Sequence, residues 1–145
     1  MLGLTDSESG LEGEGGNANE SSRVQAVVNS SGPTDMQTAY ERTNPWGKEL
    51  FQTFLGGTPE ESPAAYQTAS PTTYVTKNDP PVLTIQGGKD DLVPVQQGEL
   101  LDKKMKAAGA DHTLLIFEEE HPLGGPDREK VEAAMWDFFE KHLKR

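Results

Sequence analysis

Two side chains in the sequence could share acid–base chemistry: the carboxylate of Asp90 and the imidazole of His121. Asp90 follows the apolar run 82–85 by a few residues, and His121 follows the apolar run 113–117 in the same way. A carboxylate that accepts from one imidazole nitrogen fixes the tautomer of the ring and raises the basicity of the other nitrogen. Asp90 and His121 therefore have the residue types of the acid–base half of a Ser–His–Asp triad.

Strands and helices are expected to alternate along the chain around these two residues. Short apolar runs bounded by turn residues predict three strands, over residues 24–28, 82–85 and 113–117. Apolar side chains at helical spacing predict helices over residues 47–55, 60–68, 95–108 and 127–143. This order favours an α/β fold with about three parallel strands flanked by helices. Functional groups of such a sheet lie at the carboxyl ends of its strands, so Asp90 and His121 would stand on one rim.

The segment 82–94, Val-Leu-Thr-Ile-Gln-Gly-Gly-Lys-Asp-Asp-Leu-Val-Pro, resembles the acid-loop motif of the α/β-hydrolase superfamily. More narrowly, it is similar to the carboxylesterase branch that includes feruloyl-esterase-like and acetyl-xylan-esterase-like enzymes. Asp90 occupies the place of the acid in that motif, and His121 matches the catalytic histidine between the last strand and the last helix. Gln86 stands where the branch usually has histidine. Three further segments resemble the branch: Leu2-Gly-Leu-Thr5, Ser31-Gly-Pro-Thr-Asp35 and Ser70-Pro71.

The resemblance covers only the C-terminal half of the family's domain. It implies a partial α/β-hydrolase fold over residues 23–145, preceded by an acidic, glycine-rich lead-in over residues 1–22 that forms a loop or is disordered. In the complete family sheet, further strands would lie beside residues 24–28. This strand would then be an open edge, and an open edge can pair with a second copy of the chain to give a homo-oligomer.

The nucleophile of the implied reaction is absent from the sequence. No serine has glycine two residues before and two residues after it, and the His-Gly-Gly oxyanion motif is missing. By the family order, the serine would lie about ten residues before Met1. The implied function is hydrolysis of a small carboxylic ester without a cofactor, and the chain alone is expected to be inactive or nearly so. The alternative is a non-catalytic binding or interaction module derived from a truncated hydrolase.

Each candidate residue also has a simpler interpretation when it is taken alone. Asp90 could be a turn or helix-capping residue, and His121 could be a surface histidine. The glutamates at 118–120 precede His121 directly, but their spacing fits no standard ligand pattern, so no metal site is expected.

Four other residues with functional side chains are interpreted as structural. His112 and His142 are expected to be solvated. Trp46 and Trp136 are expected to anchor the core or helix contacts, and Trp46 is also a candidate pocket residue because loops after the first strand line the pocket in this superfamily.

Composition narrows the partners. The chain has 145 residues and a formal net charge of −11, which argues against nucleic acid and against an anionic membrane surface as partners. It has no cysteine, which excludes disulfides, thiolate metal sites and a cysteine nucleophile. No apolar stretch approaches the ~18 residues of a membrane span. The first residues lack the pattern of a secretory signal, so a cytoplasmic location is expected if the chain is expressed as given.

Overall fold

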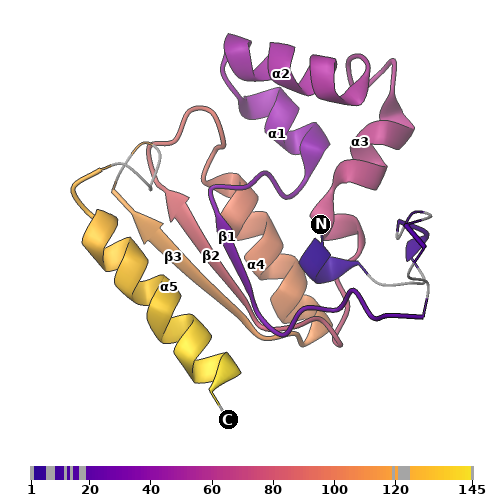
Figure 1. Ribbon diagram of the computed structural model, residues 1–145. Helices are drawn as coiled ribbons and strands as arrows, with labels where there is room; N and C mark the ends of the chain where they lie inside the picture. The colour runs from indigo at the N-terminus through magenta and orange to yellow at the C-terminus, as the bar shows by residue number, and fades with distance from the viewer. Residues whose placement is uncertain are drawn as a thin grey trace.

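A three-stranded parallel sheet, in the order β1-β2-β3, forms the centre of the computed structural model (Figure 1). The structure describes residues 2–5, 9–11, 13, 15–16, 19–118, 120 and 125–144. The strands are β1 (Val27–Ser30), β2 (Val82–Gly87) and β3 (His112–Phe117). The expected α/β class with parallel strands is confirmed, although β1 begins three residues later than the sequence pattern indicated.

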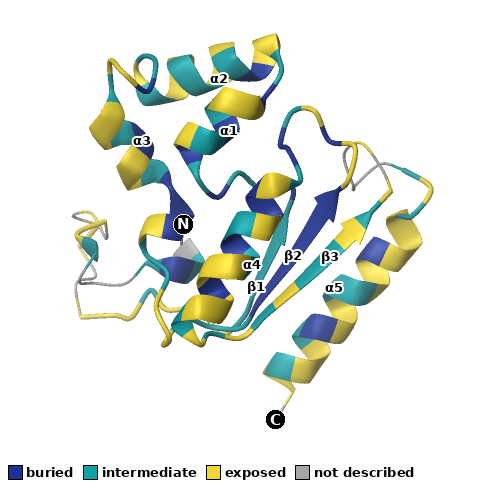
Figure 2. Ribbon diagram, turned by 180° about the vertical axis from the view of Figure 1, so that it is seen from behind, coloured by how far each residue is buried: buried dark blue, intermediate teal, exposed yellow. Residues whose placement is uncertain are grey.

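The two longest helices cover opposite faces of the sheet (Figures 1 and 2). On one face, Val82 packs with Leu101 and Met105 of α4 (Gln96–Ala108). On the other face, Leu83 packs with Val131 of α5 (Arg128–Leu143). Successive strand residues point to opposite faces, so the central strand β2 is buried along its whole length.

The apolar run 113–117 indicates a buried strand, but β3 is buried only in part. None of its residues is fully buried: Thr113 and Ile116 are exposed, Ile116 to 49%, and the other four are partly buried. The reason is position: β3 pairs with β2 alone and lies at the end of the described sheet.

Three short helices follow the carboxyl end of β1: α1 (Met36–Arg42), α2 (Pro45–Leu55) and α3 (Pro63–Ala69) (Figure 1). Helix α1 was not expected, and it begins where the side chain of Asp35 accepts the N–H of Thr38 at 3.0 Å. Helix α2 ends, as expected, at Gly56 in the left-handed conformation. After α3, the 3-10 turn η3 (Pro71–Thr73) leads back toward β2.

The opening segment contributes to the core. The 3-10 turn η1 (Leu2–Leu4) lies close against β1. A Cβ added at Gly3 would collide with the side chain of Val27, so glycine is needed at this contact. Leu4 is buried in the cluster that contains Val82 and Met105. Within the described part of the chain, no helix has the length and hydropathy needed to cross a bilayer.

Candidate active site

Asp90 lies in the loop that follows β2 at the carboxyl edge of the sheet, and only 7% of it is exposed. Its Oδ1 accepts the backbone N–H groups of Leu92 at 3.0 Å and of Val93 at 2.8 Å. Because rotation of the carboxylate would leave these buried donors without an acceptor, the two bonds fix its orientation. We call residues 88–94 the acid loop.

Three hydrogen bonds from β2 and from the corner between α1 and α2 hold residues 91–93 of the acid loop. Gln86 Nε2 donates to the carbonyl of Val93 at 2.7 Å. From the corner between α1 and α2, Thr43 Oγ1 donates to the carbonyl of Leu92 at 2.8 Å, and the backbone N–H of Asn44 donates to the carbonyl of Asp91 at 3.1 Å. Contacts from β2 and from the helical layer therefore preorganise the segment that carries Asp90.

The roles of Gln86 and Thr43 were not expected from the sequence. The sequence marked Gln86 only as the residue that replaces the histidine of the resembled branch at the end of a strand. It is fully buried, and its amide anchors the loop at the position where the resembled branch usually has histidine. Thr43 carried no signal, because its partner lies 49 residues away in the sequence.

His121 lies outside the described residues, so its pairing with Asp90 stays a prediction. Two contacts nevertheless join the start of its loop to the acid loop. The N–H of Gly88 donates to the carbonyl of Phe117 at 2.7 Å, and Lys89 Nζ lies 3.5 Å from Glu118 Oε2. His121 is three residues beyond Glu118, a reach of at most about 10 Å.

The Ser-Gly-Pro-Thr-Asp segment at 31–35 has a structural role. The buried side chain of Gln97 on α4 accepts the backbone N–H of Thr34 at 2.9 Å and of Asp35 at 2.8 Å. Ser70 Oγ accepts the N–H of Met36 at 2.8 Å. These bonds tie the turn after β1 to α4 and to the segment after α3.

Ser31 stands directly after β1 with a φ of 46°, a conformation that favours glycine. Its hydroxyl is buried and has no hydrogen-bond partner among the residues that the structure describes, and the residue is 4% exposed. A hydroxyl enclosed in this way is not accessible to a substrate, so Ser31 does not replace the missing nucleophile.

A second Asp–His arrangement lies under α4, and here the expectation that His112 is solvated is wrong. The side chain of His112 is fully buried. Its Nδ1 lies 2.8 Å from Asp102 Oδ1, and its Nε2 lies 3.0 Å from Thr84 Oγ1. Burial alone would raise the pKa of Asp102, but hydrogen bonds from Lys106 and His112 outweigh this effect and lower that pKa. Thr84 is fully buried, so this chain of groups links α4, β3 and β2 without access to a substrate.

Three further expectations are corrected. The Nε2 atom of His142 is buried rather than solvated, and its ring centroid lies 4.6 Å from that of Phe138. Trp46 and Trp136 are 59% and 68% exposed, so neither anchors the core. Their helices bury other residues instead, such as Gly47 on α2.

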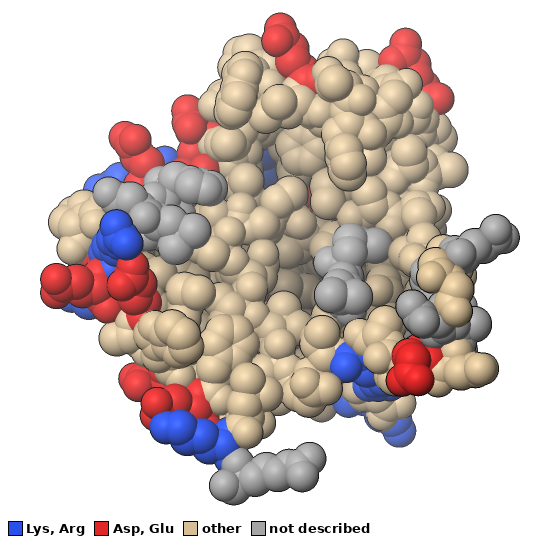
Figure 3. All heavy atoms as spheres, viewed as in Figure 1, with Lys and Arg blue, Asp and Glu red and all other residues tan. Residues whose placement is uncertain are grey.

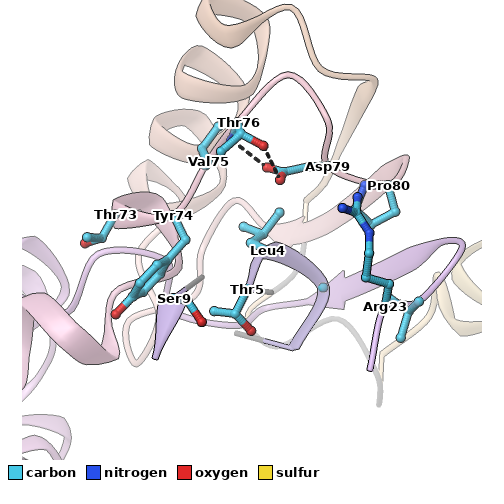
Figure 4. A pocket seen from close by; sticks show the side chains of 12 residues that line it. Leu4, Thr5, Ser9, Arg23, Thr73, Tyr74, Val75, Thr76, Asp79 and Pro80 are labelled. Atoms are coloured by element: carbon cyan, nitrogen blue, oxygen red, sulfur yellow. Dashed lines mark hydrogen bonds between the residues drawn. The ribbon is translucent and has the colours of Figure 1, made fainter. Parts of the chain in front are cut away.

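Two hollows of about 250 Å³ each lie at opposite ends of the strands. One lies at the amino ends, where Figure 4 shows Leu4, Arg23 and Asp79 around it. Asp79 is engaged there by the N–H and the hydroxyl of Thr76, both at 2.9 Å. The other, which we call the α2 hollow, lies between α2 and the acid loop. Its lining is apolar: Pro33, Gly47, Leu50, Phe51, Phe54, Leu92 and Val93. Because open α/β sheets bind ligands at the carboxyl ends of their strands, the α2 hollow belongs to the candidate site.

Comparison with known proteins agrees with this geometry. A family model described as BD-FAE matches residues 1–105. The chain belongs to the BD-FAE family. The resemblance to α/β-hydrolases inferred from the acid loop is therefore confirmed.

Two solved structures show how much of such a domain the chain covers. A truncated form of a carbohydrate esterase from gut microbiota is 28% identical with a TM-score of 0.82, over 99% of this chain and 55% of its own. An acetyl ester-xyloside bifunctional hydrolase from Caldicellulosiruptor lactoaceticus is 21% identical with a TM-score of 0.75, over 97% of this chain and 50% of its own. The second likeness concerns the fold alone.

A curated relative, described as uncharacterized peptidase YtmA of Bacillus subtilis (strain 168), is 34% identical over 84 residues. That match covers 58% of this chain and 32% of the relative. The chain thus resembles hydrolases of the esterase and peptidase type, and it spans about half or less of each relative named here.

Proposed function

We propose that this chain supplies the acid, Asp90, and the base, His121, of a serine-esterase-type site that hydrolyses a small carboxylic ester. The observation that carries the proposal is the preorganised acid loop with its fixed carboxylate at the carboxyl edge. In this mechanism His121 takes the proton of a serine hydroxyl as it attacks the ester carbonyl, and Asp90 stabilises the imidazolium. His121 then returns the proton to the leaving alcohol, and water hydrolyses the acyl-enzyme by the same route.

The serine and the oxyanion donors would come from a segment outside these 145 residues. The edge of β1 offers a place for it. The N–H groups of Val27 and Ser31 donate toward β2, so by alternation the backbone groups of Val28 and Ser30 face the open side. A parallel strand paired there would bring a nucleophile at its carboxyl end to the rim that carries Asp90.

The face on this side is suited to such a contact. In the view of Figure 3, charged side chains lie mainly around the margin of the molecule and few lie at its centre. A face of low charge costs little to desolvate when another strand covers it.

The test compares two proteins in hydrolysis of p-nitrophenyl acetate: this chain alone, and the chain extended by its upstream coding sequence to the first in-frame Gly-x-Ser-x-Gly. We expect no turnover above background from the chain alone and clear turnover from the extended protein. In the extended protein, Asp90→Asn should lower kcat by about 10⁴ and His121→Ala by a similar factor.

Asp91→Asn provides a matched control, because Asp91 is the neighbouring carboxylate and is exposed. It should leave kcat within about twofold, since only Asp90 is aimed by the acid loop. Equal losses from the two substitutions would contradict the assignment of the acid. Turnover by the chain alone that His121→Ala abolishes would contradict the need for an added nucleophile.

A non-catalytic interaction module is the second candidate. It is favoured by an exposed apolar stripe on α2, formed by Trp46, Leu50 and Phe54 at intervals of four residues, of which Leu50 and Phe54 also line the α2 hollow. If the extended protein carries the elbow but does not turn over esters, this candidate replaces the first.

A further inference from the structure

We propose that the α2 hollow is a subsite for a neutral hydrocarbon group of the ester, of about six carbons, so that the site prefers hexanoyl-sized groups over acetyl. This inference rests on the proposed function, because it takes the acid loop to be the catalytic one. It adds a substrate class that the candidate acid and base do not specify.

The hollow and the acid share the same two residues. The N–H groups of Leu92 and Val93 hold the carboxylate of Asp90, and the same two residues line the hollow. A group bound in the hollow therefore lies directly beside the candidate catalytic edge.

The wall formed by α2 is built to stand close to the acid loop. A Cβ at Gly47 would collide with the hydroxyl of Thr43, which donates to the carbonyl of Leu92 at 2.8 Å. Glycine at position 47 thus lets α2 approach while that hydrogen bond is kept. Phe51, on the same wall, packs edge-to-face on Tyr40 with ring centroids 6.5 Å apart, which fixes its ring.

The lining chemistry selects a hydrocarbon. None of the seven lining residues carries a charged side chain, so a carboxylate or a sugar hydroxyl would lose its water there without gaining a side-chain partner. The net charge of −11 further disfavours anions. For size, a dry protein cavity of about 150 Å³ holds benzene. The α2 hollow measures about 250 Å³ and opens to solvent beside Phe54, which is 75% exposed.

The test uses the chain alone, ¹⁵N-labelled, titrated with methyl hexanoate and with methyl acetate and followed by NMR. We expect saturable shifts of the Leu50, Phe51 and Val93 amides with methyl hexanoate, and binding of methyl acetate at least about tenfold weaker. Phe54→Asp should weaken binding of methyl hexanoate by about tenfold or more. Trp136→Asp is the matched control, because Trp136 is also an exposed aromatic residue on a helix and should leave binding unchanged.

Equal affinity for the two esters, or an equal effect of the two substitutions, would overturn the subsite. Shifts of the same amides with protein concentration alone would assign the hollow to a second copy of the chain and would also overturn it. Binding that is retained while the extended protein fails to hydrolyse esters would refute the proposed function and leave the subsite. Ester hydrolysis by the extended protein without binding of methyl hexanoate would refute the subsite and leave the proposed function.

Discussion

Asp102 on α4 and Asp90 at the carboxyl edge of the sheet are both held by short hydrogen bonds, but in different surroundings. Asp102 joins His112 and Thr84 in a chain with distances of 2.8 and 3.0 Å, which are distances that a catalytic triad would show. Asp90 instead accepts two backbone N–H groups, beside an open hollow. Hydrogen-bond distance alone therefore does not identify a catalytic group. The group must also be accessible to substrate and lie at the carboxyl edge of the sheet.

The two regions differ in what their bonds achieve. His112 opens β3 in register with Val82, so α4 covers its ring and its bonds join three elements of the core. The two hydrogen bonds that Asp90 accepts from Leu92 and Val93 are local and orient a single carboxylate. We therefore expect substitutions of Asp102, His112 or Thr84 to change mainly the stability of the whole domain. Substitutions in the acid loop should change mainly the local order of that loop.

The largest effect is expected for His112→Ala. The change leaves a cavity and removes the partners of Thr84 and Asp102, so the free energy of unfolding should fall by about 3 kcal/mol. Urea denaturation followed by circular dichroism measures it. Lys106→Ala removes only the exposed partner of Asp102 and should cost less than about 1 kcal/mol. A loss for His112→Ala no larger than that control would show that the buried chain contributes little.

A smaller and more local effect is expected for Asp90→Ala. The N–H groups of Leu92 and Val93 lose their acceptor, which should cost about 1–2 kcal/mol. Asp90→Asn keeps an oxygen at that place and should cost less than about 1 kcal/mol. Amide hydrogen exchange should accelerate at Leu92 and Val93 for the alanine variant. Acceleration spread evenly over the sheet would contradict a local role.

The pH dependence of stability provides a third test of the comparison. Hydrogen bonds hold the pKa of Asp102 below the value of about 3.9 of an unfolded aspartate. Such a carboxyl contributes stability that is present above its unfolded pKa and is lost as the pH falls through its folded pKa. The wild type should therefore exceed Asp102→Asn in unfolding free energy at pH 7, and the difference should narrow below about pH 4. Urea titrations at several pH values measure it, and a difference that widens toward acid would refute it.

The strands and most helices could be predicted from the sequence because each depends on a local pattern. Apolar periodicity and the glycine at 109 were sufficient to predict helix α4 and its end. The turn residues after β2 were sufficient to place Asp90 in a loop. Helix α1 escaped prediction because it is only seven residues long, so Met36, Ala39 and Tyr40 mark little more than one turn, and its start depends on the cap at Asp35.

The surroundings of the individual side chains could not be predicted, because they are set by contacts between distant segments. Nothing near His112 in the sequence reveals that α4 buries it or that Thr84, 28 residues earlier, is its partner. Trp46 has the residue type of a core anchor, but the inward face of α2 is the one that carries Gly47. The candidate acid and base were predicted from the order of the elements, whereas the residues that hold the loop of Asp90, such as Gln86 and Thr43, required the structure.

The smallest expected effect concerns the open edge of β1, where we propose that two copies of the chain associate weakly. Sedimentation velocity should show an average mass that rises with protein concentration. Ser30→Pro removes an N–H that faces outward while the ladder to β2 is kept, and proline is tolerated at such edge positions. It should return the chain to a monomer. Ser30→Ala keeps that N–H and should associate like the wild type. If both variants associate alike, the edge of β1 is not the interface. If only the proline variant is monomeric, the two copies pair through their backbones, as a complementing strand would have to do.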